Sequence, residues 1–190
     1  MNLNVCKEII KEKLTPKRYE HSIKVSEEAV RLARKYGADP EKAQIAGVLH
    51  DIMKDTPADV QLGIINEFGE VLTNVQKSSK KLWHAIAGAL YIENILKIED
   101  KDIIDAVKYH TTSKPNISKL GKVIFIADFT SADRDYDGVD MMRNAANESL
   151  EKAMEEGLSF TIKDLSNRKL PIDENTFLSY NEIILGKERS

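Results

Sequence analysis

The chain has 190 residues, of which 42% are hydrophobic and 31% charged, with a formal net charge of −3 at pH 7 and a pI near 5.9. These values are typical of one globular domain with a sizeable core, and they exclude the basic surface by which proteins bind duplex nucleic acid. The single cysteine, the absence of a signal-peptide core and a longest charge-free stretch of only residues 82–92 predict a cytoplasmic protein that does not span a membrane.

Apolar residues recur at the spacing of an α-helix along most of the chain. Thr15-Pro16 and Asp39-Pro40 each place a capping residue before a proline, and Gly37 is a typical C-terminal stop. The helices expected in the first half are 4–14, 15–37, 39–51, 56–69 and 82–96, with a polar connector at 73–81. Within 15–37, the residues expected to face the core are Ile23, Val30 and Ala33.

The second half has the same helical pattern. Its expected helices are 100–109, 117–129, 139–156, 161–167 and 174–184, with a charged loop at 133–138. Residues 123–129 (VIFIADF) are rich in β-branched and aromatic types, which suits a strand. No partner strand is evident, so we expect a buried helix there. The sequence therefore predicts one all-α domain over residues 1–190.

Each of the four histidines lies on a different expected helix, next to apolar residues: His21, His50, His84 and His110. The gaps of about 29, 34 and 26 residues exclude a local zinc motif, but they allow a site assembled from distant segments. Asp51 follows a histidine directly, and Asp128 follows the apolar run 124–127. A carboxylate in such surroundings is costly to bury unless it is paired or metal-bound. Two interpretations stay open, four unrelated helix histidines or one shared metal site.

The order of these residues resembles the HD-domain superfamily of metal-dependent phosphohydrolases, and the two additional histidines resemble its subgroup that holds two metals. The closer resemblance is to the YqeK family, which hydrolyses diadenosine tetraphosphate symmetrically to two ADP. It extends over about residues 15–185. The segments that carry it are RYEHS (18–22), LHD (49–51) with Lys54, WHA (83–85), YHTT (109–112), ADF (127–129), Arg134-Asp135 before Gly138-Val139, and 173–181.

The resemblance implies a single-domain HD-type helical bundle in which a metal-activated water attacks phosphorus. Its first metal would be held by His21, His50, Asp51 and Asp128. Asp51 would also bridge to a second metal, held by His84 and His110. One or two iron ions are implied, and the imidazole and carboxylate set also suits manganese, cobalt or zinc. The implied catalytic residues are Asp51, Lys54, His84 and His110.

Phosphoryl transfer needs positive charge around the phosphate oxygens. Lys54 lies one helical turn after Asp51, and Arg134 has a guanidinium suited to bidentate phosphate binding. The alternatives are a solvated lysine and a loop ion pair between Arg134 and Asp133, Asp135 or Asp137. Thr111 either donates its hydroxyl to phosphate or caps a helix end. The resemblance alone places Ile172 and Thr176 against the nucleoside.

Two other functions stay open at this point. The first is hydrolysis of another nucleotide, a mononucleotide or a guanosine polyphosphate, with the same metal chemistry. The second is a catalytically silent module that binds nucleotide as a sensor or scaffold. The expected partner in every case is a small nucleotide, with no nucleic acid duplex and no membrane. A homodimer is also left open, because no residue marks a dimer face.

Overall fold

The computed structural model describes residues 2–187, and every regular element in that range is helical, which confirms the all-α fold class. The elements are α1 (Leu3–Lys13), α2 (Pro16–Tyr36), α3 (Pro40–Leu49), α4 (Ala58–Glu67), α5 (Asn74–Ser78), the 3-10 turn η1 (Lys80–Leu82), α6 (Trp83–Asn94), α7 (Lys101–Lys108), α8 (Lys119–Thr130), α9 (Val139–Glu148), α10 (Leu150–Asn167) and α11 (Glu174–Lys187). A domain boundary at 1–190 stays a prediction, since residues 1 and 188–190 lie outside the description.

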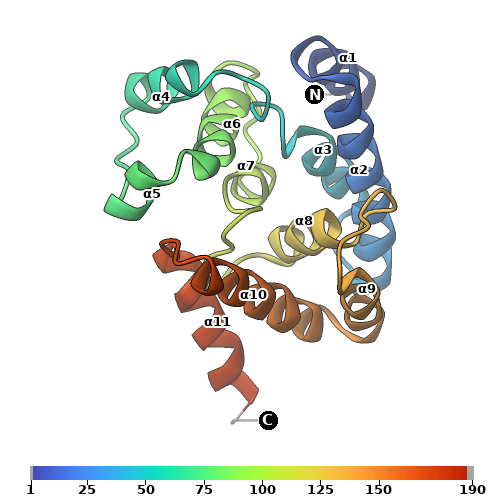
Figure 1. Ribbon diagram of the computed structural model, residues 1–190. Coiled ribbons are helices and arrows are strands. Elements are labelled where there is room, and N and C mark those ends of the chain that lie inside the picture. The colour runs from blue at the N-terminus through green and yellow to red at the C-terminus, as the bar shows by residue number, and fades with distance from the viewer. Residues whose placement is uncertain (1, 188–190) are drawn as a thin grey trace.

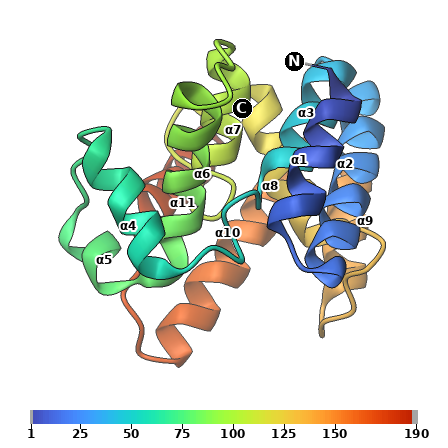
Figure 2. The same ribbon diagram turned by 90° about the horizontal axis from the view of Figure 1, so that it is seen from above.

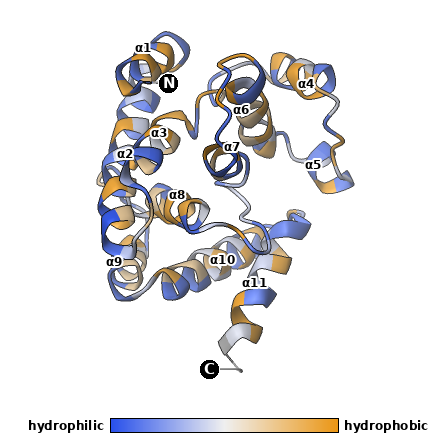
Figure 3. Ribbon diagram, turned by 180° about the vertical axis from the view of Figure 1, so that it is seen from behind, coloured by the Kyte–Doolittle hydropathy of each residue, from blue (hydrophilic) through white to orange (hydrophobic). Residues whose placement is uncertain are grey.

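Helix α8 is the centre of the fold. It packs against α2, α3, α7, α9 and α10, and Figure 1 shows it in the middle of the molecule. Seen from above, α4 to α7 lie on one side of it and α1 to α3 with α9 on the other (Figure 2). The apolar run that could have been a strand is a buried helix, as expected, and its ribbon is hydrophobic along most of its length (Figure 3). A helix that is apolar on all sides belongs in a core.

Helices α2 and α3 approach each other closely through small residues. A Cβ atom on Gly47 would lie 2.6 Å from the Cα of Ser26. The Ser26 hydroxyl donates to the carbonyl of Gln44 at 2.8 Å, which satisfies a polar group in this contact. Of the predicted inward stripe of α2, Ala33 is buried and the partly buried Ile23 packs against the core, whereas the prediction is wrong at Val30, which is partly buried and outside that core. The buried face of α2 also includes Val25 and Leu32, and the small Ser26 lies where α3 comes closest.

The helices after α8 divide differently from the prediction. The expected helix 139–156 is broken at Ser149, whose extended backbone ends α9 and whose hydroxyl caps α10 by accepting from the amide of Lys152. The expected break between 156 and 161 is absent, because α10 runs continuously through Gly157. A Cβ atom there would lie 2.9 Å from the ring of Phe125. This glycine allows close packing against α8 and does not end a helix.

Two smaller corrections concern connections. The polar connector 73–81 contains α5 and most of η1. Thr15 stands at the N-cap of α2 but makes no capping bond with its side chain. Its amide and hydroxyl instead donate to the Asp55 carboxylate at 2.8 and 2.9 Å, which ties the start of α2 to the turn after α3. Within residues 2–187, no helix is long and apolar enough to cross a membrane.

Candidate metal and phosphate site

The six residues predicted as metal ligands meet in one place between the two sides of the molecule. His21 lies on α2, His50 caps α3 and is followed by Asp51, His84 is in the first turn of α6, His110 follows α7, and Asp128 is on α8. Three sets of ligand atoms each lie within 4.8 Å of one another: His21, His50 and Asp51; His50, His110 and Asp128; and Asp51, His84 and His110. The structure therefore brings together every member of the predicted set.

Asp51 is the central member, because its two oxygens face different groups. Its Oδ1 lies 3.1 Å from Nε2 of His84 and 3.4 Å from Nε2 of His110. Its Oδ2 lies 3.5 Å from Nε2 of His50 and accepts a hydrogen bond of 2.9 Å from Arg18. We call His50, Asp51, His84 and His110 the inner cluster, since each side chain is at most 3% exposed.

His21 and Asp128 form the outer edge of the site. Nε2 of His21 lies 3.0 Å from Oδ1 of Asp128, and Nε2 of His50 lies 3.8 Å from the same oxygen. The side chain of Asp128 is 22% exposed, whereas the His21 ring is 5% exposed. This edge therefore connects the buried inner cluster to solvent.

The ends of α3 and α7 orient two imidazoles. The last carbonyls of a helix have no partner within the helix, and two of them accept from histidine Nδ1: Gly47 from His50 at 2.7 Å, and Val107 from His110 at 2.8 Å. A carbonyl can only accept, so Nδ1 carries the proton and Nε2 is left with a lone pair. Both lone pairs face the centre of the site.

The charges of the buried groups suit metal ligands. Burial lowers the pKa values of His50 and His84 to about 4, so both rings are neutral at pH 7. Burial alone would raise the pKa of Asp51, but the surrounding imidazoles and Lys54 outweigh it and hold the pKa well below its usual range. Burial would also raise the pKa of Asp128, but the hydrogen bond with His21 and the charge of Arg134 outweigh it and lower the pKa. Both carboxylates are ionised at neutral pH.

Two acceptor atoms at the centre make no hydrogen bond to a described residue, although Oδ1 of Asp51 lies close to the imidazoles of His84 and His110. Nε2 of His50 and Oδ1 of Asp51 are buried and make no hydrogen bond to any residue that the structure describes. An unsatisfied lone pair and an unsatisfied carboxylate oxygen are expensive to bury. A cation would satisfy both, and neutral imidazole with ionised carboxylate is a donor set that binds divalent transition metals. The residues therefore fit a metal.

Three cationic side chains surround the site. Arg18 contacts Asp51, Nζ of Lys54 lies 3.1 Å from Nε2 of His84, and the Arg134 guanidinium pairs with Asp128. Arg134 also donates through Nε to the Asp128 carbonyl at 2.6 Å. The alternative ion pair of Arg134 with its loop neighbours is therefore not the one that forms. Lys54 is one-third exposed but engaged with the inner cluster.

Arg18 and Asp133 lie in the site without having been predicted there. Arg18 is three residues before His21 on α2, so helical spacing places both on one face, and this signal was available in the sequence. Oδ2 of Asp133 lies 2.7 Å from Nδ1 of His21, although the two residues are 112 positions apart in the sequence. No local pattern indicates that contact.

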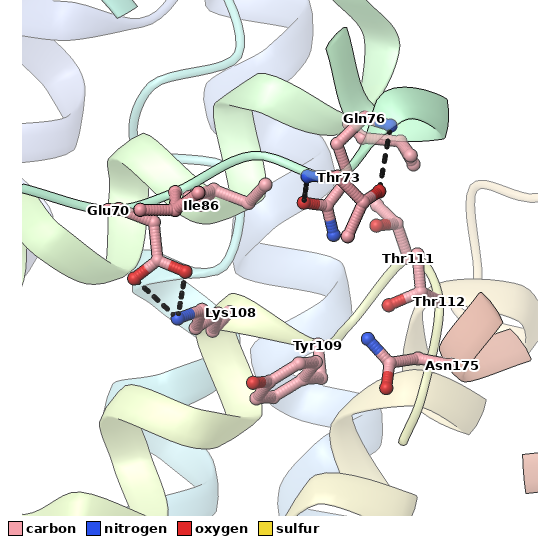
Figure 4. Close-up of a pocket in the computed structure, with 11 residues that line it drawn as sticks. Glu70, Thr73, Gln76, Ile86, Lys108, Tyr109, Thr111, Thr112 and Asn175 are labelled. Carbon is pink, nitrogen blue, oxygen red and sulfur yellow. Dashed lines mark hydrogen bonds and ion pairs between the residues drawn. The ribbon is translucent and has the colours of Figure 1, made fainter. Parts of the chain in front are cut away.

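A cavity of about 170 Å³ has Tyr109 and Thr111, the residues on either side of His110 in the sequence, in its wall (Figure 4). Tyr109, Thr111 and Asn175 line it, together with the ion pair between Lys108 and Glu70. Thr111 makes no side-chain hydrogen bond in the part of the chain that the structure describes, so its hydroxyl does not cap α7. Thr111 directly follows His110 in the sequence, so this part of the cavity wall is one residue away from the inner cluster along the chain.

The other two predicted substrate residues lie differently. Thr176 is 2% exposed, and its hydroxyl donates to the Thr112 carbonyl at 2.9 Å, so it supports the cavity wall from behind. Ile172 is half-buried and is not among the described residues that line the cavity. A second cavity, of about 340 Å³, lies beside His21 at the outer edge. Its wall includes Arg134 and Tyr136.

Comparison with known proteins gives consistent results. The sequence profile of the HD domain matches residues 18–133. A protein of Bacillus subtilis strain 168 named "Bis(5'-nucleosyl)-tetraphosphatase, symmetrical" is 34% identical over 98% of this chain and all of its own length. A protein of the same name from Halalkalibacterium halodurans is 36% identical over 99% of this chain and all of its own length.

A solved structure is also similar over the full length. It is a crystal structure of a protein from Clostridium acetobutylicum described as a predicted HD superfamily hydrolase involved in NAD metabolism. It is 35% identical in sequence, with a TM-score of 0.94, and the match covers 100% of this chain and 99% of that one. The arrangement of helices around the site is therefore shared with an HD hydrolase.

Proposed function

The chain belongs to the HD-domain family, and from this premise we propose that it is a metal-dependent phosphohydrolase that cleaves diadenosine tetraphosphate symmetrically to two ADP. The observation that best supports the metal chemistry is the position of Asp51: its two oxygens face different sets of imidazoles in a buried cluster. The substrate is supported by two full-length relatives that share the name of symmetrical tetraphosphatase.

The proposed metal ligands are the six clustered residues. His21, His50, Asp51 and Asp128 would hold a first ion, and Asp51 would bridge to a second held by His84 and His110. Iron is the proposed metal, in one or two copies, and the donor set also suits manganese, cobalt or zinc. When bound, such ions would make a water molecule a better nucleophile toward phosphorus and would polarise the phosphoryl oxygen.

Lys54, Arg134 and Arg18 are the proposed phosphate-binding groups. Each now contacts an ionised carboxylate or an imidazole of the site, so each cation is within reach of a phosphate chain placed over the cluster. Positive charge at these positions stabilises the equatorial oxygens as they gain charge in the transition state. Arg134 can bind two oxygens at once, whereas Lys54 provides a compact point charge. Thr111 is the proposed hydroxyl donor.

The two cavities suit the two ends of a symmetrical substrate. One has Tyr109 and Asn175 in its wall, with Tyr109 directly before His110 in the sequence, and the other lies beside His21 with Tyr136 in its wall. An aromatic ring and amide groups are the usual partners of a nucleobase. In this proposal each nucleoside occupies one cavity and the central phosphates contact the metal ligands. Ile172 and Thr176 are also proposed to lie near a nucleoside. Thr176 would act indirectly, through its hydrogen bond to the carbonyl of Thr112.

Product analysis tests the function directly. Protein loaded with Fe²⁺ or Mn²⁺ is incubated with diadenosine tetraphosphate in ¹⁸O-labelled water. We expect ADP as the only nucleotide product, with one ¹⁸O atom in one of the two ADP molecules. AMP with ATP would contradict symmetrical attack, and nucleotide binding without cleavage would support the silent module instead. Chelator-treated protein is the control.

A panel of dinucleoside polyphosphates, mononucleotides and guanosine polyphosphates then sets the substrate range. Elemental analysis of the protein as purified identifies the metal and its stoichiometry. The cytoplasmic location, the homodimer left open by the sequence, and the expected lack of binding to duplex nucleic acid stay predictions.

A further inference from the structure

His21 differs from the other oriented histidines in where it lies on its helix. His50 and His110 stand at helix ends, where free main-chain carbonyls accept from Nδ1. His21 is the sixth residue of α2, which continues for four further turns. The carbonyls that precede it are engaged in the helix, so its own helix offers no acceptor for Nδ1. The acceptor has to come from another segment.

Asp133 provides this acceptor. Its Oδ2 lies 2.7 Å from Nδ1 of His21, on the side of the ring opposite to Asp128. The loop that carries Asp133 is braced: Arg143 donates to the carbonyls of Ser131 and Arg134 at 3.1 and 2.9 Å. The amide of Arg134 also closes a turn onto Ser131 at 3.0 Å. The carboxylate is therefore held in place from both sides.

We propose that Asp133 is a positioning residue that fixes the His21 ring with Nδ1 protonated, so that Nε2 presents its lone pair to the metal. The inference rests on the metal site proposed above. A carboxylate that accepts from the second ring nitrogen restricts ring rotation and makes the ligand nitrogen more basic. Asp133 thus performs for His21, through a side chain, what main-chain carbonyls perform for His50 and His110.

The test measures Mn²⁺ affinity without substrate, from the free-ion EPR signal during titration. Loss of a hydrogen-bond partner of a metal ligand typically weakens metal binding about 10- to 100-fold, so we expect Asp133→Ala to raise the Mn²⁺ dissociation constant by that factor. Asp133→Asn keeps an acceptor oxygen without the charge and should fall between Asp133→Ala and wild type. Asp137→Asn removes the same charge from the same loop. Asp137 is exposed and makes no hydrogen bond or ion pair with any described residue, so the Mn²⁺ affinity of this variant should not change.

Activity gives a second readout. If Asp133 acts through His21, Asp133→Ala should lose activity at limiting Mn²⁺ and regain most of it at high Mn²⁺, whereas a distorted fold would not be rescued. Wild-type Mn²⁺ affinity in Asp133→Ala, or an equal loss in Asp137→Asn, would overturn the inference. Failure of the wild type to cleave diadenosine tetraphosphate would instead contradict the proposed function, and the affinity series would still decide the role of Asp133.

Discussion

The inner cluster and the outer edge of the site are held by different means. Side chains of the inner cluster are at most 3% exposed, and two of its imidazoles are oriented by main-chain carbonyls. At the outer edge, Asp128 is 22% exposed and its partner Arg134 33% exposed. The inner cluster therefore depends on packing, which tolerates little change. The outer edge depends on individual side-chain contacts, which substitutions can adjust one at a time.

Asp51→Ala should have the largest effect, because it removes the residue that faces both sets of ligands. Metal assistance is worth several kcal/mol in the transition state, so we expect kcat/KM to fall by about 10³-fold or more and Mn²⁺ binding to be lost. Arg18, left without its partner, is 30% exposed and can be hydrated. Far-UV circular dichroism should therefore show unchanged helix content. Activity near the wild-type level would show that the site is assigned wrongly.

Arg134→Lys tests the outer edge with a smaller expected effect. The substitution keeps the charge but removes the planar fork that binds two oxygens. Hydrogen bonds to charged groups contribute about 1.5–3 kcal/mol, so we expect kcat/KM to fall about 10- to 100-fold. Mn²⁺ content, measured in parallel, should be retained. Loss of metal together with activity would mean that Arg134 supports Asp128 and does not bind phosphate.

Gly47→Ala should have the smallest effect on activity and a clear effect on stability. The added Cβ would lie 2.6 Å from the Cα of Ser26, and overpacking of this kind costs about 1–3 kcal/mol. Gly63→Ala is the matched control: Gly63 lies inside α4 with no described atom within 4 Å of a Cβ, and alanine should stabilise that helix by about 0.5–1 kcal/mol. Urea unfolding measures both. Equal stability of the two variants would contradict the close approach of α2 and α3.

The clustering of the six proposed ligands could be predicted because their residue types are rare and chemically specific. Four histidines and two carboxylates in apolar surroundings leave few interpretations, and their order resembles a known family. The composition of 123–129 suits a strand, and the buried helix there could be predicted only because no partner strand is evident. Arg18 carried a usable signal, since it shares a helix face with His21.

The remaining contacts could not be predicted because they join distant segments. Asp133 is an ordinary loop aspartate until the fold places it 2.7 Å from a histidine 112 positions away. The burial of Ser26 on α2 could not be predicted for a related reason. Gly47 brings α3 so close to α2 that only a small side chain fits at Ser26. This close contact depends on the partner helix and not on the local pattern of α2.

The contact between Ser26 and Gly47 has a consequence for how the site meets its ion. Together with the bonds from Thr15 to Asp55, it fastens α2 to α3 and to the following turn along the length of the pair. The rings of His21 and His50 are therefore held with centroids 5.4 Å apart by the scaffold. The conformational entropy of bringing these ligands together is lost when the chain folds and not when the ion arrives. The pair is a preorganised chelate.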